Sequence, residues 1–150
     1  MKGPVSERSS TEKGAAAVEF AIVLPLLMAL LFGIIEFSLV LYDKAMITNA
    51  SREGARAGIV YHENSVTGEY EPISDADIRT VVDNYLRNNL ITFGGPVTAT
   101  TTPAHNNANR TLSVTVAYRY SFLVLPNFVG SLAGLGGGLN LTAQTVMRME

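Results

Sequence analysis

The longest apolar run in the chain extends from Phe20 to Tyr42 and contains one charged residue, Glu36. A helix rises about 1.5 Å per residue, so this run covers about 35 Å, enough to cross a bilayer core of about 30 Å. It is longer than the apolar region of a secretory signal peptide, and no small-residue cleavage site follows it. We therefore expect a membrane span over residues 20–42 that stays with the mature protein.

The helical pattern continues beyond the apolar run, because no proline or turn cluster interrupts residues 43–58. We expect this helix to end at Gly58. Residues 59–150 are then left for one small head, which begins with a turn-rich loop over residues 62–74. Tyr42 and the charged pair after it suit the far membrane interface.

One amphipathic helix is expected in the head. Ser74 is a candidate N-cap, with Asp77 three positions on as its capping partner. Apolar residues follow at helical spacing, which predicts one buried face. These residues are Ile78, Val81, Val82, Tyr85, Leu86 and Leu90.

Three segments show the alternation of strands. They are residues 97–102, 111–122 and 139–149. The middle segment is the clearest, with Leu112, Val114, Val116, Tyr118, Tyr120 and Phe122 on one face. Residues 103–110 are expected to be a turn-rich loop. The chain is therefore predicted to be α+β, with a long membrane-spanning helix that continues into a small head of one helix and about three antiparallel strands.

Charge and composition exclude several functions. The net charge is −2 and the basic residues are scattered, so no nucleic-acid partner is expected. The chain has no cysteine, and His62 and His105 have no carboxylate at metal spacing, so no metal site is expected. The sequence contains no nucleophile elbow or phosphate-binding loop, so we expect neither a cofactor nor an enzyme. Three basic residues precede the span and three follow it within a short distance, which leaves orientation open by charge.

The residues "GAAAVEF", Gly14 to Phe20, resemble the cleavage site of type IV prepilins. The resemblance implies that a prepilin peptidase cuts between Gly14 and Ala15 and removes residues 1–14 as a leader. Residues 15–58 then form the long helix of the mature chain. Glu19 becomes the fifth mature residue, followed by an aromatic residue at Phe20.

The likeness extends from Gly14 to Gly58, which resembles the N-terminal signature of TadE-like proteins, minor pseudopilins of the Tad/Flp pilus system. It is carried by "VEF", Pro25, the "IIEF" around Glu36 and the tail "NASREGARAG". The resemblance implies a single-pass protein of the bacterial inner membrane. The short N-terminal side and the large C-terminal side of the span favour an N-terminus in the cytoplasm and a head in the periplasm. The implied partners are the prepilin peptidase, other pseudopilins or the major Flp pilin, the inner-membrane assembly platform and the bilayer.

This resemblance suggests a role for each of the two glutamates and for Pro25. Glu19 would pair with the new ammonium of Ala15 on a neighbouring chain and set axial register; the alternative is a carboxylate that reaches the headgroups alone. Glu36 is either solvated near the interface or in contact with a cationic group on a partner. Pro25 either kinks the helix or is a tolerated early proline.

Two other functions stay open from the residues alone. The chain could be a single-pass anchor carrying a periplasmic binding domain that never enters a pilus. A membrane-anchored enzyme is a more distant alternative. The glycine-rich apolar segment 123–138 is expected either to contact a partner or to fold back over the core.

Overall fold

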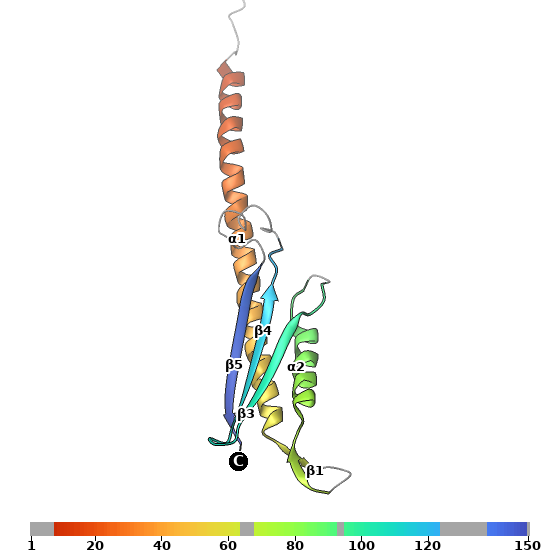
Figure 1. The fold of residues 1–150 in the computed structure, drawn as a ribbon. Coiled ribbons are helices and arrows are strands. Elements are labelled where there is room, and N and C mark those ends of the chain that lie inside the picture. Colours follow the sequence, from red (N-terminus) through yellow and green to blue (C-terminus); the bar gives the residue numbers. More distant parts are fainter. Residues whose placement is uncertain (1–7, 64–67, 93–94, 124–137, 150) are drawn as a thin grey trace, which may run out of the picture.

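The computed structural model describes residues 8–63, 68–92, 95–123 and 138–149, and it describes side chains from residue 13 onward. Its longest element is α1 (Arg8–Gly58), a single helix of 51 residues whose N-terminal half extends far beyond the head (Figure 1). The helix continues through Pro25 and ends at Gly58, as predicted.

The head contains a three-stranded antiparallel sheet in the order β3-β4-β5. Its strands are β3 (Ala99–Asn106), β4 (Thr111–Tyr120) and β5 (Leu139–Arg148). All three predicted strands are therefore confirmed, as is the α+β class. The segment expected to be a loop over residues 103–110 was partly wrong, because β3 continues through Pro103 to Asn106.

The loop expected over residues 62–74 was also partly wrong. Two short strands, β1 (Tyr61–Glu63) and β2 (Tyr70–Pro72), pair antiparallel there as a separate two-stranded sheet. Every residue of both strands is exposed. A pairing of three residues without a buried face leaves no apolar alternation in the sequence, so periodicity could not reveal it.

Helix α2 (Asp75–Asn89) follows β2 and has the predicted cap. The Ser74 hydroxyl accepts a hydrogen bond from the Asp77 backbone N–H at 3.2 Å and donates to the Asp77 carboxylate at 2.7 Å. The first turn thereby gains a partner for one of its unpaired amides. The buried face of the helix consists of Ile78, Val82 and Leu86, at the predicted spacing.

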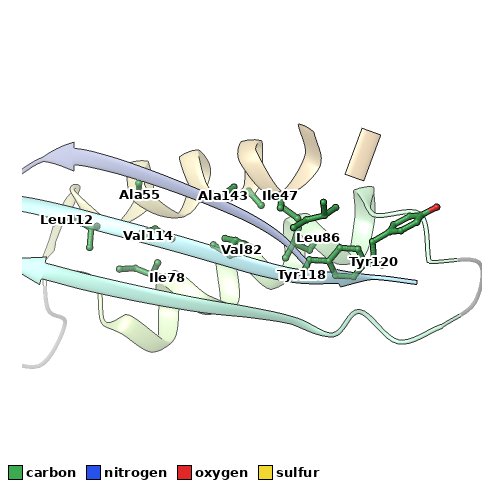
Figure 2. Close-up of a cluster of buried hydrophobic side chains, with 13 residues drawn as sticks. Ile47, Ala55, Ile78, Val82, Leu86, Leu112, Val114, Tyr118, Tyr120 and Ala143 are labelled. Atoms are coloured by element: carbon green, nitrogen blue, oxygen red, sulfur yellow. The ribbon is translucent and has the colours of Figure 1, made fainter. Parts of the chain in front are cut away.

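The core lies between one face of the sheet and the two helices (Figure 2). Strand β4 contributes all five alternating apolar residues predicted for its inner face from Leu112 to Tyr120, and α1 contributes Ile47, Ala50 and Ala55. Gly54 lets α2 approach closely, because a Cβ there would lie 2.5 Å from the Val82 side chain. The C-terminal part of α1 therefore forms one wall of the core, up to the helix end at residue 58.

Each outer strand of the sheet receives a hydrogen bond from a basic side chain on a helix. The Met149 N–H donates to the Arg110 carbonyl, so the backbone groups of Met149 point toward β4. Because this direction alternates along an antiparallel strand, the backbone groups of Thr142, an odd number of residues away, point away from β4. The Lys44 ammonium donates to this outward Thr142 carbonyl. On the opposite edge, Arg79 of α2 donates to the Thr101 carbonyl at 3.3 Å.

The proline in β3 also fits this alternation in the direction of the backbone groups. On β3, Pro103 stands opposite Val114, at a position whose backbone nitrogen points away from β4. Its missing N–H therefore removes no hydrogen bond from the ladder, which explains why a proline is accommodated within this edge strand.

Candidate functional site

The N-terminal half of α1 carries the residues that the sequence marked for processing and assembly. None of the side chains from residue 13 to residue 35 is buried. Within the described residues, α1 is also the one helix that is long and apolar enough to cross a membrane. This half of α1 therefore presents its apolar surface to whatever surrounds the molecule.

Gly14, Ala15, Glu19 and Phe20 all lie on this exposed half. The bond between Gly14 and Ala15 is inside the helix, and a Cβ added at Gly14 would meet no atom within 4 Å. Among the described residues, Glu19 has no hydrogen bond or ion pair. The head thus leaves these four residues accessible, and it supplies no partner for the Glu19 carboxylate.

Glu36 lies differently, because the head encloses it. Its side chain is 2% exposed. One carboxylate oxygen accepts a hydrogen bond from the Tyr120 hydroxyl at 2.7 Å and another from the Leu123 backbone N–H at 2.8 Å. Burial and the adjacent Glu36 carboxylate both raise the pKa of the Tyr120 hydroxyl, which therefore remains a donor.

The sequence had suggested a solvated Glu36 or a cation on a partner. The structure instead buries the carboxylate and gives it two donors from its own chain, 84 and 87 residues away. Hydrogen bonds to a buried carboxylate offset the cost of removing it from water. Glu36 therefore joins the end of the exposed apolar stretch to the end of β4.

A second carboxylate, Asp43, was expected at the membrane interface but is fully buried. One of its oxygens accepts a hydrogen bond from the Ile91 backbone N–H at 3.2 Å, and the other has no hydrogen-bond partner among the described residues. Burial raises the pKa of Asp43, and the bond from Ile91 opposes this change only in part. Asp43 thus attaches α1 to the segment that connects α2 with β3.

Glu36 and Asp43 are seven residues apart, which is close to two helical turns, so they share one face of α1. Together they hold against the helix the end of the head that lies next to the exposed half of α1. This spacing was the one feature of the sequence that could have indicated a shared buried face, but an acidic pair at heptad spacing is also common on solvated helices. Their burial depends on the strand and loop that meet them, which local pattern does not predict.

The described residues show no other cluster of side chains suited to metal binding or catalysis. They contain no group of three or more histidine, cysteine, aspartate or glutamate residues that could hold a metal ion. His105, which the sequence placed in a loop without a partner, lies on β3 and contacts the Asp75 carboxylate at 3.0 Å. This pair is partly exposed and lies at the start of α2, where it suits a structural role. The glycine-rich segment 123–138 lies almost wholly outside the described residues.

Comparison with known proteins supports the resemblance seen in the sequence. A family model described as TadE-like protein matches residues 14–56. The match begins at the glycine of the expected cleavage site and ends two residues before the end of α1. No curated protein and no solved structure matches the chain.

Proposed function

We propose that this chain, whose residues 14–56 match the family model described as TadE-like protein, is a minor pseudopilin of a Tad pilus system. The family match by itself suggests a component associated with the Tad pilus, and the family is a structural one. The observation that carries the finer proposal is the shape of α1. Its apolar half stands clear of the head, whereas its other half is built into the head's core.

The burial of Glu36 refines where the membrane would lie. The head packs against one face of α1 from Glu36 onward, so in this proposal the span expected over residues 20–42 is reassigned to Ala15–Ile35. Twenty-one residues at about 1.5 Å each give about 31 Å, close to the thickness of the hydrocarbon core. The N-terminus is cytoplasmic in this proposal, because the short side of the chain precedes the span and the whole head follows it.

Glu19 has its role in assembly under this proposal. It lies one turn inside the span and has no partner within the described chain. Cleavage after Gly14 creates an ammonium at Ala15, and a neighbouring subunit shifted along the axis can bring that ammonium to Glu19. Each charge is costly alone in a low-dielectric surrounding, so the pair favours one register between subunits.

The second candidate function is a membrane-anchored binding domain that is never processed or assembled. The described part of the head carries hollows of about 260–310 Å³, large enough for a small ligand, and these are the observation that favours this second function. The two functions differ at the N-terminus of the mature protein. A pseudopilin starts at Ala15, whereas a plain anchor keeps its first 14 residues.

The test is N-terminal sequencing and intact mass of the protein purified from membranes of cells that contain the Tad system. We expect a start at Ala15 in the wild type and an uncut chain in the Gly14→Leu variant. Gly33→Leu is the matched control, because it changes another glycine of α1 at which an added Cβ would also meet no atom within 4 Å. An uncut wild-type chain in cells with an active peptidase would contradict the pseudopilin role.

A further inference from the structure

The hairpin formed by β1 and β2 is a two-stranded sheet whose residues are all exposed. Figure 1 shows it at the end of the head away from the exposed half of α1. Two of its side chains are aromatic, Tyr61 and Tyr70, which are 45% and 70% exposed. A two-stranded hairpin alone is only marginally stable in water, and exposed tyrosines are typical of interfaces. The hairpin is therefore a candidate surface for contact with another molecule.

The hairpin lies in the most acidic part of the chain. Residues 57–78 contain five carboxylates and no lysine or arginine. Four of these carboxylates have interactions of their own within the chain. These four are Glu69, Glu71, Asp75 and Asp77. The fifth, Glu63, ends β1 and has neither a hydrogen bond nor an ion pair within the described residues. Glu63 is thus the carboxylate that is open to a cation from outside.

The last turns of α1 carry exposed cations. Arg52 and Arg56 are four residues apart, so they lie on one face of the helix. Both are exposed, and neither has a hydrogen bond or an ion pair within the described part of the chain. Their exposed neighbour Glu53 forms no ion pair with either of them. This face of α1 therefore presents two guanidinium groups to whatever lies beside the head.

The hairpin and the arginine face are chemically complementary. A guanidinium group pairs with carboxylates and also stacks on aromatic rings. Glu63 stands directly opposite Tyr70 in the hairpin, so the two side chains lie on the same face of the small sheet. One arginine from another molecule can contact both of them at once. Within one chain the two surfaces are not joined, because Arg56 forms no ion pair with Glu63.

The register proposed for the membrane helices brings these two surfaces to the same height. When Ala15 of one copy meets Glu19 of its neighbour, the helices are shifted by four residues, about 6 Å along the axis. Arg56 of the shifted copy then stands level with residue 60 of the neighbour. At that level the neighbour's α1 has ended and its hairpin is about to begin. One axial shift therefore suits both pairs of charges.

We propose that the β1–β2 hairpin of one copy docks on the Arg52–Arg56 face of α1 in a second copy, with Arg56 paired to Glu63 and stacked on Tyr70. The two surfaces differ, so the contact is heterologous and can repeat from copy to copy. The proposal rests on the proposed function and deepens it. It gives the heads a contact of their own, beside the pairing of Glu19 with Ala15 in the membrane.

Cross-linking between two differently tagged copies tests the contact, because the chain has no cysteine of its own. One copy carries Glu53→Cys, an exposed position that leaves both arginines in place. The other carries His62→Cys on the exposed strand β1. Both are full chains in membranes of cells that contain the Tad system, and the reagent is a short bis-maleimide. We expect a cross-linked product that contains both tags, and none when both copies carry Glu53→Cys.

Exchange of the charges tests the ion pair itself. Arg56→Glu in the Glu53→Cys copy should lower the cross-linked fraction about tenfold, because two carboxylates then face each other. Adding Glu63→Arg to the His62→Cys copy should restore most of the product, since opposite charges meet again. This recovery would show that the loss is not a folding defect. Arg148→Glu is the matched control, because it makes the same change of charge at an exposed arginine of β5 and should leave the yield unchanged.

Three results would overturn the proposed contact. The first is the absence of a cross-link between copies that keep their native charges, and the second is a yield that Arg56→Glu does not change. The third is a His62→Cys chain that cross-links to a different membrane protein and not to the second copy. A product formed only between two Glu53→Cys copies would likewise contradict it, since that product reports a symmetric contact between helices.

N-terminal sequencing of the same samples separates this contact from the pseudopilin role. Chains that start at Ala15 but do not cross-link contradict the contact alone. Uncut chains that cross-link in a charge-dependent way support the contact and contradict the pseudopilin role. Uncut chains without a cross-link contradict both.

Discussion

The contact between Tyr120 and Glu36 can be tested by removing one oxygen atom. Tyr120→Phe deletes the hydroxyl that donates to the buried carboxylate at 2.7 Å and leaves the ring in place. The ring can keep its edge-to-face contact with Phe122, whose centroid is 5.8 Å away. The Leu123 N–H remains as the second donor to the same oxygen.

The expected loss follows from the burial of both partners. Hydrogen bonds to charged groups contribute about 1.5–3 kcal/mol, and removing one donor leaves the acceptor partly unsatisfied. We therefore expect the end of the head around Glu36 and Tyr120 to lose about 2 kcal/mol of local stability, about thirtyfold in its opening equilibrium. The rest of the core does not contact this hydroxyl and should change less.

Hydrogen–deuterium exchange of the detergent-solubilised chain measures this opening directly, because the Leu123 amide is itself a donor to Glu36. Its exchange should become about thirtyfold faster in Tyr120→Phe, while the buried centre of β4 keeps its protection. Tyr118→Phe is the control: this neighbouring tyrosine is 7% exposed, and its hydroxyl has no hydrogen bond within the described chain. Equal exchange at Leu123 in both variants and the wild type would refute the idea that Glu36 holds the head.

Three further predictions concern the long helix. Gly54→Ala should destabilise the head by about 1–3 kcal/mol in thermal unfolding, because its Cβ would lie 2.5 Å from Val82, whereas Gly33→Ala should be neutral or slightly stabilising. Because burial raises the pKa of Asp43, the folded chain holds this proton longer, and stability should fall as pH rises from 3.8 through the folded pKa. Asp43→Asn should flatten that decline in urea unfolding across pH; an unchanged slope would contradict the assignment. Glu19→Gln should leave cleavage and head stability intact but reduce co-purification with tagged pilus partners, on the order of a hundredfold in affinity; unchanged recovery would leave Glu19 without an assembly role.

The elements with a strong repeating pattern could be predicted from the sequence. Strand β4 places an apolar residue at every second position from Leu112 to Tyr120, and each of these predicted inward residues is buried. The cap at Ser74 was predictable because its two bonds are local and depend on residues three positions apart. The long apolar helix was predictable because its length alone exceeds what most soluble helices require.

The partners of the buried acids could not be predicted in the same way. The donors to Glu36 come from residues 84 and 87 positions later, so the pairing depends on the topology of the whole head. The hydropathy of residues 36–42 also resembles that of residues 20–35, so the local pattern could not reveal that the head packs against α1 from Glu36 onward. The short pairing of β1 with β2 was missed because exposed strands carry no apolar signal.

The hydrogen bonds at the two outer strands have a consequence for how copies of this chain can associate. A strand edge with unpaired backbone groups is a template on which another chain can add its own strand. Proteins at high local concentration must block this strand addition. Here Lys44 covers a carbonyl of β5, Arg79 covers one of β3, and Pro103 removes a donor beside it. Strand addition is thus disfavoured on both sides, which protects copies of this chain at high local concentration from forming β-aggregates. The exposed apolar half of α1 is then a surface that stays open to contact with neighbouring molecules.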